Sequence, residues 1–184
     1  MDDLQAIQCL KKGDIGGLEV LVTRYQSKAV RAAFLVVHDE SLAEDVVQDT
    51  FIRIYRRIHN LDLSHPFEPY LLRSVVNAAL NVAQKADRRH LSLEGDLHQV
   101  EGLLSQASSV GSEIEYLELK QQIIAALSRL EPRQRAAVVQ RYYLNMSEKE
   151  MAVALDAPPG TVKWILNTAR AKLRNLLGSE RSAE

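Results

Sequence analysis

Apolar residues recur at helical spacing along almost the whole chain of 184 residues, and this pattern restricts its fold more than any other feature. One stripe, with spacings of three and four residues, is formed by Leu18, Leu21, Val22, Tyr25 and Ala29. Val and Ile nowhere alternate with polar residues over the length of a strand. The sequence therefore predicts an all-α protein.

The helical pattern falls into two groups. Residues 1–90 hold three amphipathic stretches with short connections, which is enough to close one small core. Residues 91–113 are rich in Ser, Gly and acidic residues and lack a sustained period, which is typical of a linker. The pattern resumes over residues 114–178, and residues 179–184 form a tail. We expect two small helical domains joined by an acidic, flexible linker.

The charged residues are segregated along the chain. The formal net charge is −1, which argues against a protein that coats nucleic acid without specificity. Residues 91–119 contain six acidic residues and no Lys or Arg, whereas residues 129–177 contain nine basic and four acidic residues. Such segregation indicates a charged partner for the carboxyl-terminal part.

Several classes of protein are disfavoured by composition. No apolar run approaches the roughly 18 residues that cross a bilayer, and Asp2 and Asp3 stand where a secretory signal carries positive charge. We therefore expect a cytoplasmic protein with no membrane insertion. Cys9 is the only cysteine and the five histidines lack zinc-site spacing, so we expect no metal and no cofactor. No nucleophile–base pair or phosphate-binding glycine loop is present, so we expect no enzyme.

Three helix starts are predicted from local sequence. Ser41 and Glu44, and again Ser147 and Glu150, have the spacing of a capping box. Pro132 suits the first turn of a helix, where its missing amide costs nothing, and that helix is expected over residues 133–143.

The last two predicted helices have the form of a helix-turn-helix. A short helix after Ser147 is followed by a tight turn at residues 156–158 and by a longer helix from Pro159 to about Leu177. The second helix of such a unit enters the major groove of DNA, and residues near its amino end reach base edges first. The expected base readers are Thr161, Lys163, Trp164 and Asn167, and the residues expected nearer phosphate are Arg170, Lys172 and Arg174. Alternatively, the unit is a helical hairpin with a solvated charged face, in which Trp164 packs on the neighbouring helix.

Five short motifs follow one another in the carboxyl-terminal part. They are "LxxLxPRQR" from Leu127, "RYY" from Arg141, "SxxExA" from Ser147, "GTVK" from Gly160 and "ARxKLR" from Ala169. Through them residues 119–177 closely resemble region 4 of the extracytoplasmic-function (ECF) sigma factors. That string is far more specific than a lone helix-turn-helix.

The amino-terminal part resembles region 2 of the same family. The match is carried by "LVTRYQ" from Leu21, "AEDVVQDTFIRIYR" from Ala43 and "FxxYLxRxxxN" from Phe67. In the family, the helix with "AEDxxQ" binds the clamp helices of the largest polymerase subunit. The resemblance thus assigns core polymerase binding to Glu44, Asp45, Gln48 and Asp49. By charge alone, a solvated helix face would look the same.

The resemblance also implies a site for the minus-10 element of a promoter. Residues 60–69 and the helix after them correspond to the part that captures an unstacked base and holds the single strand. The implied contacts are Phe67, Tyr70 and Asn77, with Arg73, Lys85, Arg88 and Arg89 for backbone phosphates. The alternative for Phe67 and Tyr70 is that they fill the core at the helix start.

The chain departs from the family pattern at a few positions. Tyr70 stands where the family usually has Trp, and Asn81 replaces a common Asp. Residues 164–165 and 167–168 are Trp-Ile and Asn-Thr, where members often carry Ser-Arg and His-Arg. Two customary positive charges are therefore missing from the recognition helix, which predicts weaker DNA affinity and an altered minus-35 preference.

The function implied is that of an alternative sigma factor. Such a subunit brings core RNA polymerase, through its clamp helices and flap, to promoter DNA and opens it, and an anti-sigma factor commonly holds it inactive. Two other functions remain open: a helix-turn-helix regulator that binds duplex DNA without joining polymerase, and an all-helical scaffold with no DNA role. Binding to core polymerase separates the first of these from a sigma factor, and salt-dependent binding to promoter DNA in the holoenzyme would exclude the scaffold.

Overall fold

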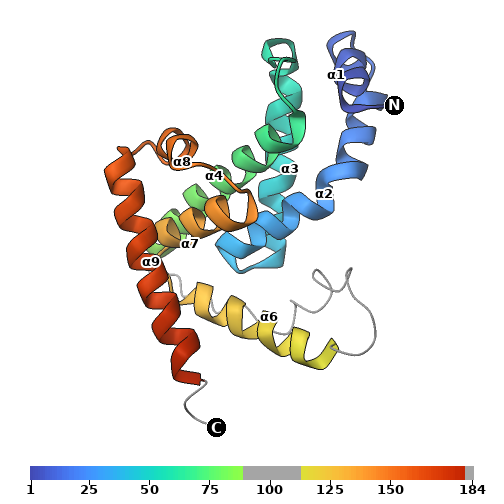
Figure 1. The fold of residues 1–184 in the computed structure, drawn as a ribbon. Coiled ribbons are helices and arrows are strands. Elements are labelled where there is room, and N and C mark those ends of the chain that lie inside the picture. The colour runs from blue at the N-terminus through green and yellow to red at the C-terminus, as the bar shows by residue number, and fades with distance from the viewer. Residues whose placement is uncertain (89–112, 181–184) are drawn as a thin grey trace.

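The computed structural model describes residues 1–88 and 113–180, and within them the regular structure is helical (Figure 1). The all-α prediction is confirmed. The amino-terminal part holds α1 (Asp3–Lys11), α2 (Gly16–Val37), α3 (Glu40–Arg56), the 3-10 turn η1 (Ile58–Asn60) and α4 (Phe67–Arg88). The carboxyl-terminal part holds α6 (Glu113–Ser128), α7 (Pro132–Val138), the π turn η3 (Val139–Tyr143), α8 (Glu148–Ala154) and α9 (Pro159–Glu180). Nearly all of the expected linker and most of the tail lie outside the described residues.

The helix starts agree only partly with the sequence prediction. The capping box at Ser147 is present, with the Glu150 amide donating to Ser147 Oγ at 3.3 Å. The box predicted at Ser41 is wrong. α3 begins earlier because the Asp39 carboxylate, held in extended backbone, accepts from the amide of Leu42 at 2.8 Å and so caps the helix first.

Two further features differ from expectation. α1 was not predicted, and it begins at a capping box formed by Asp2 and Gln5. The helix expected over residues 133–143 is shorter, because α7 ends at Val138 and the chain widens into the π turn η3. Pro132 does occupy the first turn of α7.

α2 is the central helix of the amino-terminal part. It packs against α1, α3 and α4, so that these helices form one bundle around it (Figure 1). Val46 and Val47 of α3 are buried, as are Val75 and Val76 of α4. This bundle fixes which face of α3 and of α4 remains available to a partner.

The two groups of helices pack against each other. α7 lies against α4 and also contacts α2, while α9 packs on α6, α7 and α8. One continuous apolar cluster includes Val75 of α4, Ala136 of α7 and Leu166 of α9. In this arrangement the two parts therefore share a core, although each was expected to close its own.

Within residues 1–88 and 113–180, no helix has both the length and the hydropathy needed to cross a bilayer.

Candidate nucleic-acid interface

The helix-turn-helix is formed by α8, a turn and α9. Asp156 makes the turn with a left-handed backbone, φ 46°. Arg133 Nη2 donates to the carbonyl oxygen of Leu155 at 2.8 Å, which ties the end of α8 to α7. Val162 and Leu166 are buried and anchor α9. The four expected base readers of α9, Thr161, Lys163, Trp164 and Asn167, are all exposed.

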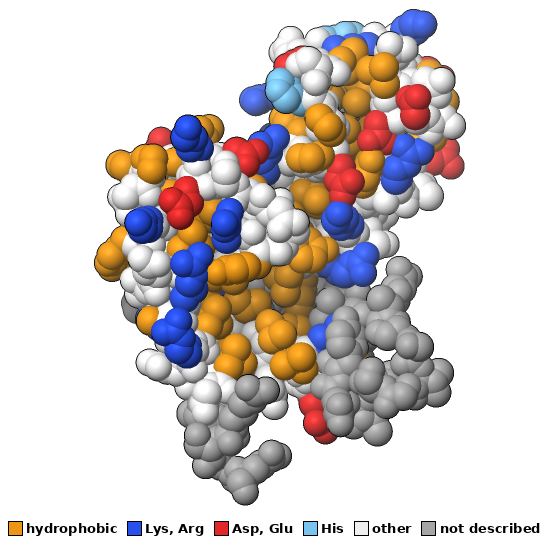
Figure 2. Space-filling model, in the orientation of Figure 1, with side chains coloured by type: hydrophobic (Ala, Val, Ile, Leu, Met, Phe, Trp, Pro, Cys, Tyr) orange, Lys and Arg blue, Asp and Glu red, His pale blue; other side chains and the backbone are white. Residues whose placement is uncertain are grey.

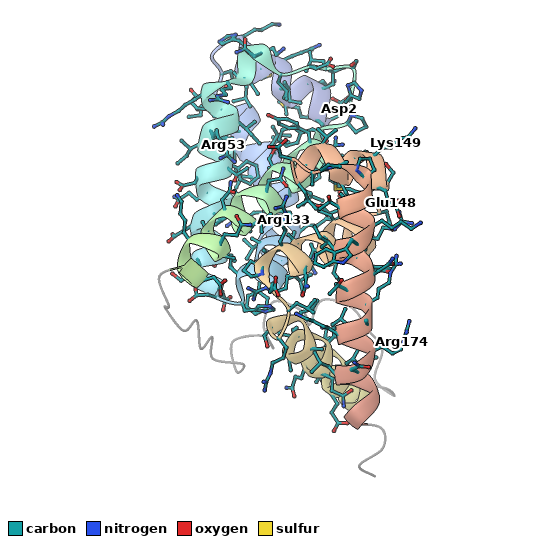
Figure 3. All side chains as sticks on the ribbon, turned by 90° about the vertical axis from the view of Figure 1, so that its left-hand side faces the viewer. Asp2, Arg53, Arg133, Glu148, Lys149 and Arg174 are labelled. Carbon is teal, nitrogen blue, oxygen red and sulfur yellow. The ribbon has the colours of Figure 1, made fainter. Side chains whose placement is uncertain are left out.

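The three basic residues farther along α9 have different surroundings. Arg174 is exposed and points away from the neighbouring helices (Figure 3). Arg170 Nε donates to the Tyr142 hydroxyl at 2.7 Å, with the guanidinium 5.8 Å from that ring's centre. Lys172 Nζ donates to Gln134 Oε1 at 3.2 Å, so this side chain lies toward α7 while part of it stays exposed. Ile165, at a position where the family often has Arg, is buried.

The outer face of α3 carries the residues expected to bind polymerase. Glu44, Asp45, Gln48 and Asp49 are all exposed. The opposite face, with Val46 among its residues, is buried against the bundle. α3 makes its main contacts with α2 and α4, so the packing of the carboxyl-terminal helices leaves this polar ridge uncovered.

A cavity of about 690 Å³ lies between the loop before α4 and the start of that helix. Three of the expected minus-10 contacts, Phe67, Tyr70 and Arg73, line it together with Arg57 and His65. Tyr70 is 38% exposed at this site. Arg57 and His65 were missed by the sequence prediction, although both adjoin the run of turn-forming residues that marks the loop.

A local network shapes this loop. The Ser64 amide donates to Asp62 Oδ1 at 2.9 Å, and the Ser64 hydroxyl donates to Asp62 Oδ2 at 2.8 Å. These hydrogen bonds hold the pKa of Asp62 below its usual value. Asp62 therefore stays ionised and braces the rim of the cavity.

Phe67 is buried in the core and also lines the 690 Å³ cavity, and its role as a base contact stays a prediction. The side chain is 3% exposed, and its ring centre lies 5.8 Å from that of Tyr25. As the first residue of α4, Phe67 turns its ring into the bundle, which leaves Tyr70 as the accessible aromatic residue. The burial of Phe67 agrees with the core alternative, whereas Tyr70 is exposed to solvent.

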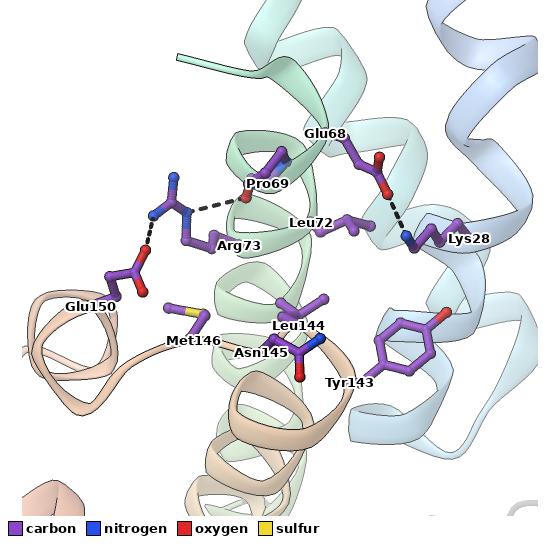
Figure 4. Close-up of a pocket in the computed structure, with 10 residues that line it drawn as sticks. All are labelled: Lys28, Glu68, Pro69, Leu72, Arg73, Tyr143, Leu144, Asn145, Met146 and Glu150. Atoms are coloured by element: carbon purple, nitrogen blue, oxygen red, sulfur yellow. Dashed lines mark hydrogen bonds and ion pairs between the residues drawn. The ribbon is translucent and has the colours of Figure 1, made fainter.

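Two of the minus-10 candidates, Arg73 and Asn77, lie where the two parts meet. Arg73 Nη1 donates to Glu150 Oε1 at 3.2 Å beside a second cavity of about 360 Å³ (Figure 4). Gln140 Nε2 donates to Asn77 Oδ1 at 3.1 Å. Lys85 is exposed, whereas the side chain of Arg88 and the whole of Arg89 lie outside the described residues. The carboxyl-terminal part thus occupies polar groups that were expected to meet DNA.

His38 is buried at the end of α2, against α6 and α7. Burial is the main cause that lowers its pKa to about 4, and the positive charge of Arg135 adds to the effect, while the nearby backbone of Leu127 opposes it. Burial also lowers the pKa of Arg135. The contact between the two parts therefore favours a neutral imidazole.

An apolar groove of about 250 Å³ lies beside α9. It is hollowed between the column of Lys and Arg side chains on α9 and the amino-terminal bundle (Figure 2). Its lining residues are Leu35, Ile123, Leu127, Val138, Val139, Tyr142, Tyr143, Leu173 and Leu177. The groove therefore joins α2 to the carboxyl-terminal helices and offers apolar surface to a partner.

Two family models match the chain and together span more than half of it. Sigma-70 region 2 matches residues 21–89, and Sigma-70 region 4 matches residues 120–173. The first model covers α3 with its polar ridge and α4 with the 690 Å³ cavity, and the second covers the helix-turn-helix.

Curated relatives match over nearly their whole length. The ECF RNA polymerase sigma factor SigW of Bacillus subtilis is 27% identical over 177 residues, which is 93% of this chain and 94% of the relative. The ECF RNA polymerase sigma-E factor of Escherichia coli K12 is 29% identical over 180 residues, which is 95% of this chain and 94% of the relative.

Two solved structures share the fold of this chain. CnrH, in complex with the cytosolic domain of CnrY, has a TM-score of 0.61 at 24% identity, over 96% of this chain and 97% of CnrH. RpoE of Bartonella quintana, in complex with the anti-sigma factor NepR, has a TM-score of 0.62 at 20% identity, over 87% of this chain and 96% of RpoE. The chain belongs to the extracytoplasmic-function family of RNA polymerase sigma factors, and it directs transcription initiation as an alternative sigma factor.

Proposed function

We propose that residues 1–90 bind core polymerase and the minus-10 element, and that residues 114–178 bind the minus-35 element. The observation that carries this division is the exposed polar ridge on α3, formed by Glu44, Asp45, Gln48 and Asp49, which the rest of the fold leaves uncovered. A regulator that binds duplex DNA without joining polymerase does not need a polymerase-binding surface of this kind.

On the amino-terminal part, the 690 Å³ cavity is proposed to receive one unstacked base of the minus-10 element. Tyr70 supplies an aromatic face, and Arg57 and Arg73 supply positive charge for the strand that leads to it. Stacking and phosphate contacts would offset the unstacking energy, which is on the order of a few kcal/mol per step.

Part of the proposed minus-10 site is covered by the carboxyl-terminal part and has to be exposed before it can bind DNA. Arg73 and Asn77 are occupied by Glu150 and Gln140 of the carboxyl-terminal part. We propose that core polymerase separates the two parts and holds them at the spacing of the two promoter elements. The free chain is then expected to bind promoter DNA poorly, because each reader alone is small and the net charge is near zero.

We further propose that an anti-sigma factor stabilises the closed arrangement, in which the carboxyl-terminal helices pack against the amino-terminal bundle. The apolar groove lies where such a partner would contact α2 and the carboxyl-terminal helices at once. The named structural neighbours were solved as complexes, RpoE with the anti-sigma factor NepR and CnrH with CnrY, which motivates this proposal. The chain is proposed to act in the cytoplasm, where polymerase is found, and without a catalytic site of its own.

The test is in vitro transcription with bacterial core polymerase over genomic fragments, followed by mapping of the start sites. The chain is expected to produce a limited set of starts, and the double substitution E44K/D45K is expected to abolish them together with co-elution with core polymerase. Reversing two exposed charges removes the attraction that the ridge supplies and leaves the buried face of α3 intact. The matched control is Glu19→Lys, which reverses one exposed charge on α2.

The two classes of function separate on this experiment. Co-elution of E44K/D45K with core polymerase at wild-type level would refute the role of the ridge. Starts that depend on duplex binding by the chain, with no binding to core polymerase, would favour a helix-turn-helix regulator instead.

A further inference from the structure

The centre of the exposed face of α9 is uncharged. Trp164 is 64% exposed, and the residues three or four positions before and after it, Gly160, Thr161, Asn167 and Thr168, lie on the same face. None of these five residues carries a charge. On this face, α9 would therefore present the apolar ring of Trp164 and the side-chain amide of Asn167 to base edges.

The positive charges of α9 lie beside this face. Lys163, Arg170 and Arg174 follow one another at spacings of seven and four residues, which places them along one flank of the helix. Arg170 is held by Tyr142. Arg170 and Arg174 suit phosphates along one groove wall, whereas Lys163, near the amino end of α9, can reach a base edge together with the residues around Trp164.

Gly160 lies about one turn before Trp164 on the same face of α9. A helical side chain covers the turn that precedes its own Cα, so the ring of Trp164 lies toward Gly160. A Cβ built on Gly160 would meet no heavy atom within 4 Å. The fold itself therefore does not require glycine at this position, whereas close approach of a partner to the ring would.

The chemistry of this face matches A·T base pairs. In the major groove, thymine presents a C5-methyl group that takes an apolar contact, and adenine presents N7 and N6 to a side-chain amide. Trp164 offers an apolar surface and Asn167 offers the amide. Arg170 Nη1 lies 3.4 Å from Asn167 Oδ1, where it donates a hydrogen bond and orients that amide.

We infer that Trp164 contacts a thymine methyl group and Asn167 pairs with an adenine, so that α9 selects A·T pairs in the minus-35 element. This inference rests on the proposed minus-35 role of residues 114–178 and names the bases that this site reads. Arg170 is a positioning residue for Asn167.

Thymine is tested by removing its methyl group. Open-complex formation is measured with holoenzyme that contains the full chain, at the strongest start site from the in vitro transcription experiment. Each thymine of its minus-35 element is replaced in turn by uracil, on either strand. With the wild-type chain, one replacement is expected to lower the rate of open-complex formation about fourfold, the equivalent of one buried CH₂ group. With Trp164→Ala, the same replacement is expected to have no effect.

Adenine is tested in the same way with 7-deazaadenine, which lacks the N7 acceptor. The wild-type chain is expected to lose about tenfold in open-complex formation at one position, and Asn167→Ala is expected to be insensitive there. Asn175→Ala, on the same face of α9 but farther from its amino end, is the control and should keep the wild-type sensitivity to both analogues.

The outcomes distinguish this inference from the proposed function. If specific starts occur but no uracil or 7-deazaadenine replacement matters, or if Trp164→Ala and Asn167→Ala keep full sensitivity, the base contacts are refuted while the sigma function stands. A minus-35 element without A·T pairs refutes them as well. If no specific start occurs with core polymerase, both proposals fail.

Discussion

At the scale of single residues, Gly17 shows how closely two helices approach. A Cβ at this position would lie 2.1 Å from the carbonyl oxygen of Ala6, which belongs to α1. Main-chain atoms cannot move aside as a flexible side chain can. We expect Gly17→Ala to lower the free energy of unfolding by about 1–3 kcal/mol, measured by urea denaturation, because α1 must shift away from α2.

Gly178→Ala is the matched control for that change. A Cβ at Gly178 meets nothing within 4 Å, and alanine favours the helix, so its midpoint of unfolding should stay level or rise slightly. If Gly17→Ala unfolded at the same urea concentration as the wild type, the close approach of α1 and α2 would be contradicted.

At the scale of elements, the start of α8 depends on one side chain. Ser147 Oγ accepts from the Glu150 amide, and Glu150 Oε2 accepts from the Ser147 amide at 2.9 Å. We expect Ser147→Ala to lower the free energy of unfolding by about 1 kcal/mol in thermal denaturation, because the Glu150 amide at the helix start loses its acceptor. Ser147→Asp, which keeps an acceptor at the cap, should retain most of the stability, and equal loss in both variants would argue against the capping role.

The starts of α3 and α8 show when a capping-box sequence predicts the first residue of a helix and when it does not. The box at Ser147 was predicted correctly because the competing Asn145, two residues earlier, has a left-handed backbone, φ 53°, whereas an N-cap residue needs an extended one. The box at Ser41 was not, because Asp39 lies two residues earlier and its carboxylate is the stronger acceptor. Spacing alone does not rank two candidate caps, and their geometry decides between them.

At the scale of the whole molecule, the closed arrangement is linked to the charge of His38. The imidazole is buried against Arg135 of α7 and beside the ring of Phe34, and it lies near the backbone of Leu127 in α6. Its pKa is about 4 in this structure, against about 6.5 in an unfolded chain. Stability from the neutral form is therefore fully present above about pH 6.5 and is lost as the pH falls toward 4.

We expect acid to weaken the folded chain more when His38 is present. Between pH 7.5 and 5.5, the free energy of unfolding of the wild type should fall by about 1 kcal/mol more than that of His38→Asn. Asparagine is the matched replacement because His38 has a left-handed backbone, φ 56°, which Asn tolerates. Urea denaturation at both pH values measures the difference, and parallel losses in the two proteins would refute the linkage.

The sequence by itself determined the helical class, the polar ridge on α3 and the exposed residues at the amino end of α9. Each follows from periodicity within a single element, since a helix that buries Val46 and Val47 must expose Glu44 and Asp45 on its other side. Tertiary structure decided what no single helix encodes. Phe67 became a core residue, Lys172 turned toward α7, and Asn77 was paired with Gln140, 63 positions farther along the chain. These contacts depend on how α4, α7 and α9 pack together, and that packing is a property of distant residues brought into one apolar cluster.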